Sequence, residues 1–306
     1  MDLHLLRSFR EVARERSFTA AAKNLLLTQP AVSQQVKALE TEIGERLLDR
    51  SGREVRPTKA GEVLLEAADR VFALLDDAVR RVKETRATEE GAVTLACGDT
   101  VALYLLPPAL ADFRARFPKA EVVVRNHHSR EIVELVLSGG ADLGVVTAPP
   151  HLDPALESAT LLEERLVLAL PPGHARAEKG IERLSEIEGE PAVMLAKPSV
   201  TRSVVERGLR AAGTTVSTVF ESGNLEVVKA YVARGFGLSF LPQMAVTTED
   251  RARFSVHAIP GDFPRRRLVV LRRRDRFRTR LAKELTAALA RHARVSRAKR
   301  AGGASG

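Results

Sequence analysis

The side chains best suited to specific hydrogen bonding lie close together near the N-terminus, between Thr28 and Lys37. Hydroxyl, amide and amine groups occur there on Thr28, Gln29, Ser33, Gln34 and Lys37. Such groups can bond to the edges of DNA bases, and an amine can also bind a phosphate. Apolar residues recur among them at helical spacing, namely Ala31, Val32, Val36 and Leu39. One helix would therefore carry the polar groups on its outer face, with Thr28 as N-cap and Pro30 in its first turn.

Two further helices are predicted to position this one. Apolar residues at helical spacing predict an amphipathic helix over residues 2–15. Ser17 and Thr19 offer an N-cap for a short helix over Ala20–Leu25, whose alanines would let two helices cross closely. A short turn leads from there to the polar helix. This order is typical of a helix-turn-helix, and we favour it over an ordinary three-helix bundle with a polar surface.

A second group of side chains able to bind phosphates follows Gly44, which we expect to end the polar helix. Residues 47–58 predict two short strands joined at Ser51 and Gly52, an arrangement called a wing. The wing carries three arginines, Arg50, Arg53 and Arg56. Two arginines beside a glycine turn can enter a minor groove or clamp phosphates. The wing strengthens the prediction of a DNA-binding domain over residues 1–60.

Residues 9–61 closely resemble the winged helix-turn-helix of LysR-type transcriptional regulators. Three motifs carry the resemblance: S-F-T-x-A-A from Ser17, T-Q-P-A-V-S-x-Q-V-x-x-L-E from Thr28, and P-T-x-A-G from Pro57. Leu48 stands where the family usually has phenylalanine, which we interpret as a packing change. The resemblance implies a set of DNA-binding residues: Thr28, Gln29, Pro30, Ser33, Gln34, Lys37, Arg50 and Arg53.

A long helix is predicted next, over residues 61–88. Its apolar residues are spaced alternately by four and three, at Leu64, Ala68, Val71, Leu75, Ala78 and Val82. Charged residues cover the other faces, so the narrow apolar stripe favours pairing with a second copy over packing on its own domain. In LysR-type regulators this helix joins two subunits, which implies a homodimer through residues 61–88 and a homotetramer as the final assembly. Residues 87–92 would form a hinge.

Residues 91–293 predict an α/β domain. Short β-rich runs, at residues 92–96, 121–126, 142–147 and 166–170, alternate with helical stretches. Residues 131–146 also align without a gap to residues 226–241, each as helix, glycine and apolar strand. Two similar α/β lobes with a cleft between them are the simplest interpretation. The resemblance implies the periplasmic-binding-protein-like effector domain of LysR-type regulators, so the chain is α/β overall.

A ligand between two such lobes would meet helix N-termini, where unpaired N–H groups favour anions. The expected effector-binding residues are Asp99, Thr100, Thr147, Ser199, Thr201, Arg202 and Asn224. Most of these are ordinary N-capping types, so capping without a ligand is the alternative for each. Arg202 could pair with an effector carboxylate. The carboxylate of Asp99 would repel an anion unless it points away from the cleft.

The excess positive charge of the chain is concentrated near the C-terminus. The 306 residues include 48 Lys and Arg and 39 Asp and Glu, a formal net charge of +9. Residues 1–60 hold 11 basic and 8 acidic side chains, whereas residues 265–300 hold 15 and 2. The latter stretch predicts a strand at 268–271, a helix over 276–293, and a basic, disordered tail over 294–306. We favour a solvated basic surface there over a contact with DNA phosphates.

Several function classes find no support in the sequence. No apolar run reaches the roughly 18 residues of a membrane helix, and no secretory signal is visible, so we expect a cytoplasmic protein. The single cysteine, Cys97, excludes an intrachain disulfide, and His127 and His128 would point to opposite faces of a strand, so no metal site is expected. No nucleophile elbow, glycine-rich phosphate loop or HExxH motif indicates an enzyme.

The leading hypothesis is a DNA-binding transcriptional regulator without a cofactor. Its expected partners are double-stranded promoter DNA, a small-metabolite effector and a second copy of the chain, with RNA polymerase as a further candidate. A solute-binding protein, a ligand-independent DNA-binding protein and an enzyme with a DNA-binding appendage are the alternatives. The missing signal and the attached winged helix disfavour the first of these, and the lack of a catalytic constellation disfavours the last.

Overall fold

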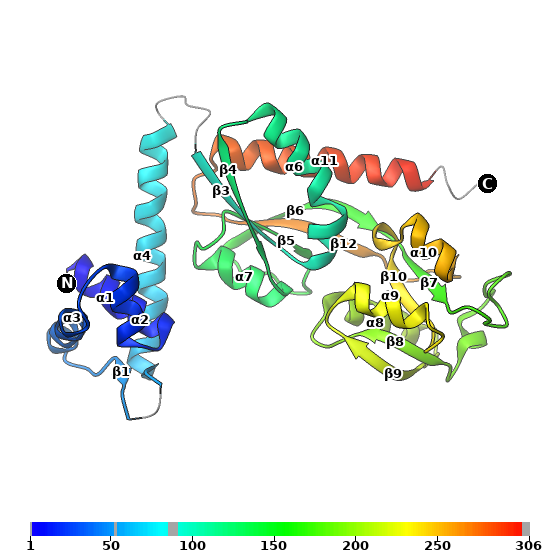
Figure 1. The fold of residues 1–306 in the computed structure, drawn as a ribbon, viewed down its shortest axis with the longest axis horizontal. Helices are drawn as coiled ribbons and strands as arrows, with labels where there is room; N and C mark the ends of the chain where they lie inside the picture. The colour runs from blue at the N-terminus through cyan, green and yellow to red at the C-terminus, as the bar shows by residue number, and fades with distance from the viewer. Residues whose placement is uncertain (1, 52–53, 85–90, 302–306) are drawn as a thin grey trace. The chain divides into compact units, whose positions relative to one another are not determined.

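The computed structural model describes residues 2–51, 54–84 and 91–301, in two compact units divided between Thr85 and Arg86 (Figure 1). The first unit holds four helices and a two-stranded sheet: α1 (Leu3–Glu15), α2 (Phe18–Leu25), α3 (Gln29–Ile43), β1 (Leu48–Asp49), β2 (Arg56–Pro57) and α4 (Lys59–Glu84). Arg53, predicted as a wing contact, and residues 87–90, the first four residues of the predicted hinge, lie outside the described residues.

Local capping explains where the first three helices begin. The side chains of Asp2, Ser17 and Thr28 accept hydrogen bonds from backbone N–H groups of α1, α2 and α3 respectively. Gly44 ends α3 at φ +81°, a backbone conformation that glycine adopts without strain. The helix α2 therefore starts at Phe18, two residues before the predicted start, because Ser17 and not Thr19 is the cap.

The three helices share one apolar core. Phe9 and Val12 of α1 and Val32, Val36 and Leu39 of α3 are fully buried. Ala68 and Phe72 of α4 belong to the same core, so the first half of the long helix packs on its own unit. Asp69 of α4 also pairs with Arg10 at 2.5 Å and with Arg14 at 2.8 Å, which fixes α4 against α1.

The second unit consists of two lobes, built from similar sheets. Lobe I (residues 91–164 and 266–301) has the strand order β4-β3-β5-β12-β6. Its strands are β3 (Gly91–Cys97), β4 (Ala120–Asn126), β5 (Leu143–Thr147), β6 (Leu156–Glu164) and β12 (Arg266–Arg273). Its helices are α5 (Asp99–Tyr104), α6 (Leu106–Arg116), α7 (Ser129–Leu137) and α11 (Arg280–Ala301). The strands β3, β4 and β5 are parallel, and β12 lies antiparallel between β5 and β6.

Lobe II (residues 166–265) repeats this order as β9-β8-β10-β7-β11. The strands β8 and β9 pair in parallel, a bridge between Ala192 and Leu238 joins β8 to β10, and β7 lies antiparallel between β10 and β11. The strands are β7 (Leu166–Leu170), β8 (Pro191–Leu195), β9 (Ser217–Ser222), β10 (Ser239–Pro242) and β11 (Ser255–Ala258). The helices are α8 (Val200–Ala211), α9 (Leu225–Val232), α10 (Thr248–Arg253) and two 3₁₀ turns, Leu184–Ile187 and Gln243–Ala245.

The internal alignment of the sequence is confirmed by these elements. Helix α7 leads through a glycine turn into β5, and helix α9 leads through Gly235 into β10. The chain crosses between the lobes twice. Arg165 alone separates β6 from β7, and residues 259–265 return from β11 to β12. Each sheet also includes one strand that lies outside the aligned segments and antiparallel to both of its neighbours. This strand is β12 in lobe I and β7 in lobe II.

The C-terminal helix differs from its prediction. Helix α11 begins at Arg280, four residues later than expected, and continues to Ala301. The helix thus extends into the stretch predicted as a disordered tail, residues 294–306, of which residues 302–306 lie outside the described part. Alanine, arginine and lysine are good helix formers, so a basic composition does not stop a helix already begun. Within the described residues, no helix has both the length and the apolar content for crossing a membrane.

Gly61, the last residue of the P-T-x-A-G motif, packs against the wing. A Cβ at this position would lie 2.0 Å from the carbonyl oxygen of Leu47, a backbone atom that cannot rotate away. We expect Gly61→Ala to lower the free energy of unfolding of the first unit by about 1–3 kcal/mol, measured by urea denaturation of the full chain. At Gly98 the nearest atom to a new Cβ is 3.7 Å away, so Gly98→Ala is the control. Equal losses in the two variants would contradict this account.

Candidate functional site

The first half of α3 presents the predicted base-contacting side chains outward. Gln29, Gln34 and Lys37 are exposed and Ser33 is half-buried, whereas the apolar residues on the opposite face of α3 are fully buried. Thr28 and Pro30 are exposed at the start of the helix, where the Thr28 hydroxyl accepts from the Ala31 N–H at 3.4 Å. The remaining amide of this segment, Gln35, accepts a 2.5 Å hydrogen bond from Ser8 of α1. The packing of α3 on α1 therefore determines which of its polar groups are available.

Glu40, the last residue of the motif that starts at Thr28, joins α3 to the wing. Its Oε1 accepts hydrogen bonds from the backbone N–H groups of Leu47 and Leu48, at 2.9 and 3.2 Å. Its Oε2 lies 3.3 Å from Arg50, whose guanidinium also stacks over the Phe18 ring at 4.8 Å. Arg50 is thus held beside α2 and α3, with 43% of its side chain exposed.

In the second unit, the starts of α5 and α9 bring three predicted effector residues together. The amide of Asn224 donates to the Asp99 carboxylate at 3.3 Å, and Thr100 is next to Asp99 in the first turn of α5. The Asn224 side-chain oxygen meanwhile accepts from the Glu226 N–H at 2.8 Å and caps α9. The carboxylate of Asp99 therefore faces lobe II and does not point away from it.

The other predicted effector residues are engaged within the protein. The Thr147 hydroxyl accepts from Arg266 at 3.0 Å, and both side chains are buried. Ser199 caps α8, and Thr201 is buried in that helix. Among the described residues, no hydrogen bond links the start of α8 to the starts of α5 or α9. These three residues lie in the expected elements without joining the Asp99 and Asn224 pair.

Arg202 is not available for an effector carboxylate. Its Nε donates to Glu206 at 2.8 Å, its Nη1 to the Leu195 carbonyl at 3.2 Å, and its Nη2 to Thr218 at 3.2 Å. The residue is only 8% exposed. We correct the predicted role, because each guanidinium nitrogen already has a partner inside lobe II and the arginine connects α8 to β8 and β9.

A buried lysine forms a second contact between the lobes. The Lys229 ammonium of α9 lies 2.6 Å from Asp250 of α10 and donates to the Tyr104 hydroxyl of α5 at 2.8 Å. Glu226 completes this lysine cluster, 3.0 Å from Lys229 and hydrogen-bonded to Tyr104. Lys229 is 2% exposed, and the cluster joins residues about 125 positions apart in the chain. Sequence periodicity could mark Lys229 as a charge on an apolar helix face but could not identify its partners.

The groups of the lysine cluster keep their protonation states around neutral pH. Burial lowers the pKa of Lys229, but hydrogen bonds to Asp250, Tyr104 and Glu226 outweigh burial and hold that pKa above its usual value. Burial raises the pKa of Tyr104 to about 12, with the Glu226 carboxylate adding to the rise. Lys229 therefore stays protonated, and Tyr104 keeps its hydroxyl proton, through the physiological range.

Cys97 lacks the properties of a reactive thiol. It is fully buried at the end of β3, and burial, with the nearby charge of Asp99, raises its pKa to about 12. The thiolate, which is the reactive form, is therefore scarce at neutral pH. His127 bonds to Glu131 at 3.0 Å, and the described residues contain no cluster of three or more metal-ligating side chains.

Two protein-family models match the chain. The model described as "Bacterial regulatory helix-turn-helix protein, lysR family" matches residues 3–62. The model described as "LysR substrate binding domain" matches residues 86–294, more than half of the chain. The two models therefore cover the two units separately.

Known proteins also match most of the chain. A probable RuBisCO transcriptional regulator from Cyanidioschyzon merolae is 31% identical over 257 residues, which cover 81% of this chain and 83% of that protein. The HTH-type transcriptional regulator AlsR of Bacillus subtilis is 31% identical over 248 residues, covering 80% and 82%. Among solved structures, full-length OxyR from Pseudomonas aeruginosa has a TM-score of 0.77 at 23% identity, covering 94% of each chain. CbnR in complex with its target DNA has a TM-score of 0.65 at 23% identity, covering 97% and 100%.

Removal of the Asp250 carboxylate should show how much the burial of the Lys229 charge costs in free energy of unfolding. We expect Asp250→Asn to lower the free energy of unfolding by about 3–5 kcal/mol at pH 7, because it removes the buried counter-charge of Lys229 and leaves only the half-exposed carboxylate of Glu226 beside it. The double variant Lys229→Met/Asp250→Asn should recover part of the loss, since no buried charge is left unpaired. Chemical denaturation measures both. From neutral pH upward, the stabilisation from Lys229 should persist to its usual pKa of 10.5 and disappear only as the pH rises through its raised pKa. A double variant no more stable than Asp250→Asn would contradict this account.

Proposed function

The chain belongs to the LysR family of transcriptional regulators, and on this premise we propose that it binds promoter DNA as a dimer and responds to a small metabolite held between lobes I and II. The outward face of α3 carries the proposal. Gln29, Gln34 and Lys37 project from a helix whose opposite face is fixed by complete burial of Val32 and Val36. A helix of this kind fits the major groove, where amide groups distinguish base pairs.

The wing would add contacts to the DNA backbone. Arg50 is held at the start of the wing by Glu40 and Phe18, so its guanidinium is already oriented when DNA arrives. A phosphate bound there gains a bidentate donor without the full entropy cost of ordering a long side chain. Arg53 stays a proposed partner of Arg50 in the wing on the strength of the sequence motif.

The second half of α4 is the proposed subunit interface. Val71, Leu74, Leu75 and Val79 are 38 to 65% exposed, whereas Ala68 and Phe72 are buried in their own unit. These four residues recur at helical spacing and form one apolar face that the first unit leaves uncovered. The same face on a second copy of the chain would cover it, and further contacts between effector domains would assemble two dimers into the proposed homotetramer.

The proposed effector site is centred on Asp99, Thr100 and Asn224. The carboxylate of Asp99 lies where lobes I and II touch, so an effector must present a hydrogen-bond donor toward it. The N-termini of α5 and α9 favour negative charge elsewhere on the same ligand. A metabolite with both a donor and an acid group, such as an amino or hydroxy acid, meets both demands. RNA polymerase is the further partner that we propose for the promoter-bound protein.

Base recognition by α3 can be tested through the ratio of specific to non-specific binding. We expect Gln29→Ala and Ser33→Ala to weaken operator binding by about 1–3 kcal/mol while leaving random duplex binding unchanged, because each removes a base contact. Lys37→Ala is the control for loss of a charge and should weaken both. Titration of labelled duplexes at fixed salt measures the affinities. Equal weakening of operator and random DNA by Gln29→Ala would reject the proposed role of α3.

The subunit interface can be tested by the mass of the particle. We expect Leu74→Glu to shift the oligomer toward monomer by at least ten-fold in dissociation constant, because the carboxylate would be buried unpaired in the apolar seam. Val63→Glu makes the same change at a residue that is 72% exposed near the start of α4, and should leave the mass unchanged. Sedimentation equilibrium over a range of concentrations measures both. An unchanged mass for Leu74→Glu would exclude this face as the interface.

A further inference from the structure

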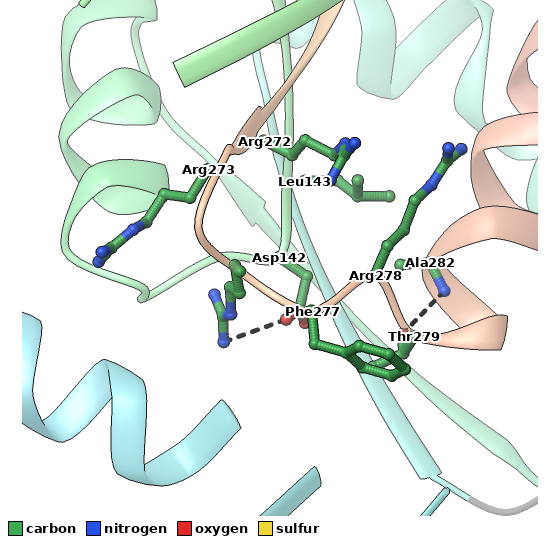
Figure 2. Close-up of a pocket in the computed structure, with 9 residues that line it drawn as sticks. Asp142, Leu143, Arg272, Arg273, Phe277, Arg278, Thr279 and Ala282 are labelled. Atoms are coloured by element: carbon green, nitrogen blue, oxygen red, sulfur yellow. Dashed lines mark hydrogen bonds and ion pairs between the residues drawn. The ribbon is translucent and has the colours of Figure 1, made fainter. Parts of the chain in front are cut away.

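An arginine-lined pocket lies in lobe I, where β5 begins, β12 ends and α11 begins (Figure 2). Its lining includes four arginines, Arg272, Arg273, Arg276 and Arg278, together with Asp142 and Thr279. None of these residues belongs to the proposed effector site or to the lysine cluster. The pocket thus gathers basic side chains in a part of the fold that the proposed function does not use.

Two of the four arginines are neutralised inside the protein. Arg273 donates from Nε to Asp275 at 2.8 Å and from Nη1 to the Leu137 carbonyl at 2.9 Å. Arg276 lies 3.2 Å from Asp142, and its Nη1 also donates to the Gly139 and Ala141 carbonyls. These two arginines hold the turn between α7 and β5 against the turn that precedes α11. Their role is structural.

Of the other two arginines, only one has a carboxylate partner among the described residues. Arg272 pairs with Glu157, its neighbour across β12 and β6. Arg278 forms no ion pair with any described residue, and its Nε is buried without a hydrogen-bond partner. In Figure 2 both guanidinium groups extend to the same side of the pocket, past Leu143. The charge of Arg278 also adds to the effect of burial in lowering the pKa of Arg272, so the two groups interact.

This arrangement is unfavourable for the protein alone. A buried N–H without a partner costs about 1–3 kcal/mol, and like charges in a partly buried site repel. The N-terminus of the 22-residue helix α11 adds partial positive charge at the same place. An anion with several oxygen atoms would supply a counter-charge for both arginines and acceptors for their terminal N–H groups.

We infer that this pocket binds a small tetrahedral oxyanion, inorganic phosphate or a phosphomonoester, between Arg272 and Arg278 at the start of α11. The flat guanidinium fork matches two phosphate oxygens with two parallel hydrogen bonds. The Thr279 hydroxyl accepts from the Ala282 N–H at 3.1 Å and keeps its own hydrogen for a further oxygen. Because Arg272 and Thr279 are largely buried, a small anion fits the site better than the backbone of a duplex does.

Thermal unfolding of the full chain tests the inference, with sodium phosphate compared against sodium chloride at equal ionic strength. Phosphate should raise the melting temperature of the wild-type protein in a saturable way, because it binds the folded state. Arg278→Gln should weaken this response at least ten-fold in apparent dissociation constant. Arg267→Gln removes the same charge from an exposed position on β12 and should respond as the wild type does.

A second measurement separates ligand binding from a structural role of the arginine. Without phosphate, Arg278→Gln should melt at or above the temperature of the wild type, since it removes a repelled charge and an unpartnered buried N–H. A clearly lower melting temperature for this variant would overturn the inference. So would equal phosphate responses in Arg278→Gln and Arg267→Gln.

The source of the oxyanion can be distinguished in the same assay. O-phosphoserine that matches phosphate, with loss of both responses in Arg278→Gln, supports a phosphomonoester ligand. A response to phosphate alone supports the inorganic ion. Stabilisation by a random DNA duplex, lost in Arg278→Gln, with no response to either small anion, would show a nucleic-acid contact and overturn the inference. Phosphate binding is measured without operator or effector, so its outcome does not depend on the proposed function.

Discussion

The buried contact between Glu164 and Arg266 is the constraint on which the two-lobed unit depends. Glu164 is the last residue of β6 and Arg266 the first of β12, so the pair stands where the chain leaves lobe I and where it returns. Their side chains are 5% and 4% exposed, and Arg266 also donates to Thr147 of β5. Glu164 accepts from the Met244 N–H at 2.9 Å, which ties the crossover to lobe II. A buried pair of this kind adds little net stability, but loss of one partner is costly, so it fixes the register of both crossings.

The same reasoning explains the first unit, where packing selects the functional face. Complete burial of Val32, Val36 and Leu39 leaves only one rotation of α3 about its axis. Gln35 is used against Ser8, and Gln34 is directed outward, although the two neighbouring residues are chemically identical. Specificity for a ligand in this unit therefore begins with apolar contacts on the far side of the helix.

Much of this organisation could be predicted from local sequence. The cap at Thr28 and the glycine at 44 gave the bounds of α3, because capping depends on adjacent residues alone, whereas two candidate caps, Ser17 and Thr19, left the start of α2 two residues late. The repeat of helix, glycine and strand was equally visible. The features that could not be predicted depend on residues far apart in the sequence. Arg202 had a suitable type and position for a ligand contact, but it donates hydrogen bonds to Leu195 and Thr218, which lie on two separate strands. Lys229 and Tyr104 meet only because two lobes fold against each other. Helix α11 continues past Ala293 because alanine, arginine and lysine favour a helix, although the basic composition of this stretch resembles that of a disordered tail.

The insertion of lobe II into lobe I has a consequence for the order of synthesis. Lobe II is a continuous stretch, residues 166–265, inserted into lobe I, so a ribosome delivers all of its strands before the last part of lobe I. In lobe I, β12 lies between β5 and β6, and α11 supplies Leu285 and Leu289 to the core beneath the sheet. Both elements are among the last to be made. Lobe I is therefore begun first but completed second. The edges of β5 and β6 stay unpaired until β12 is made, although lobe II already has all the residues of its core.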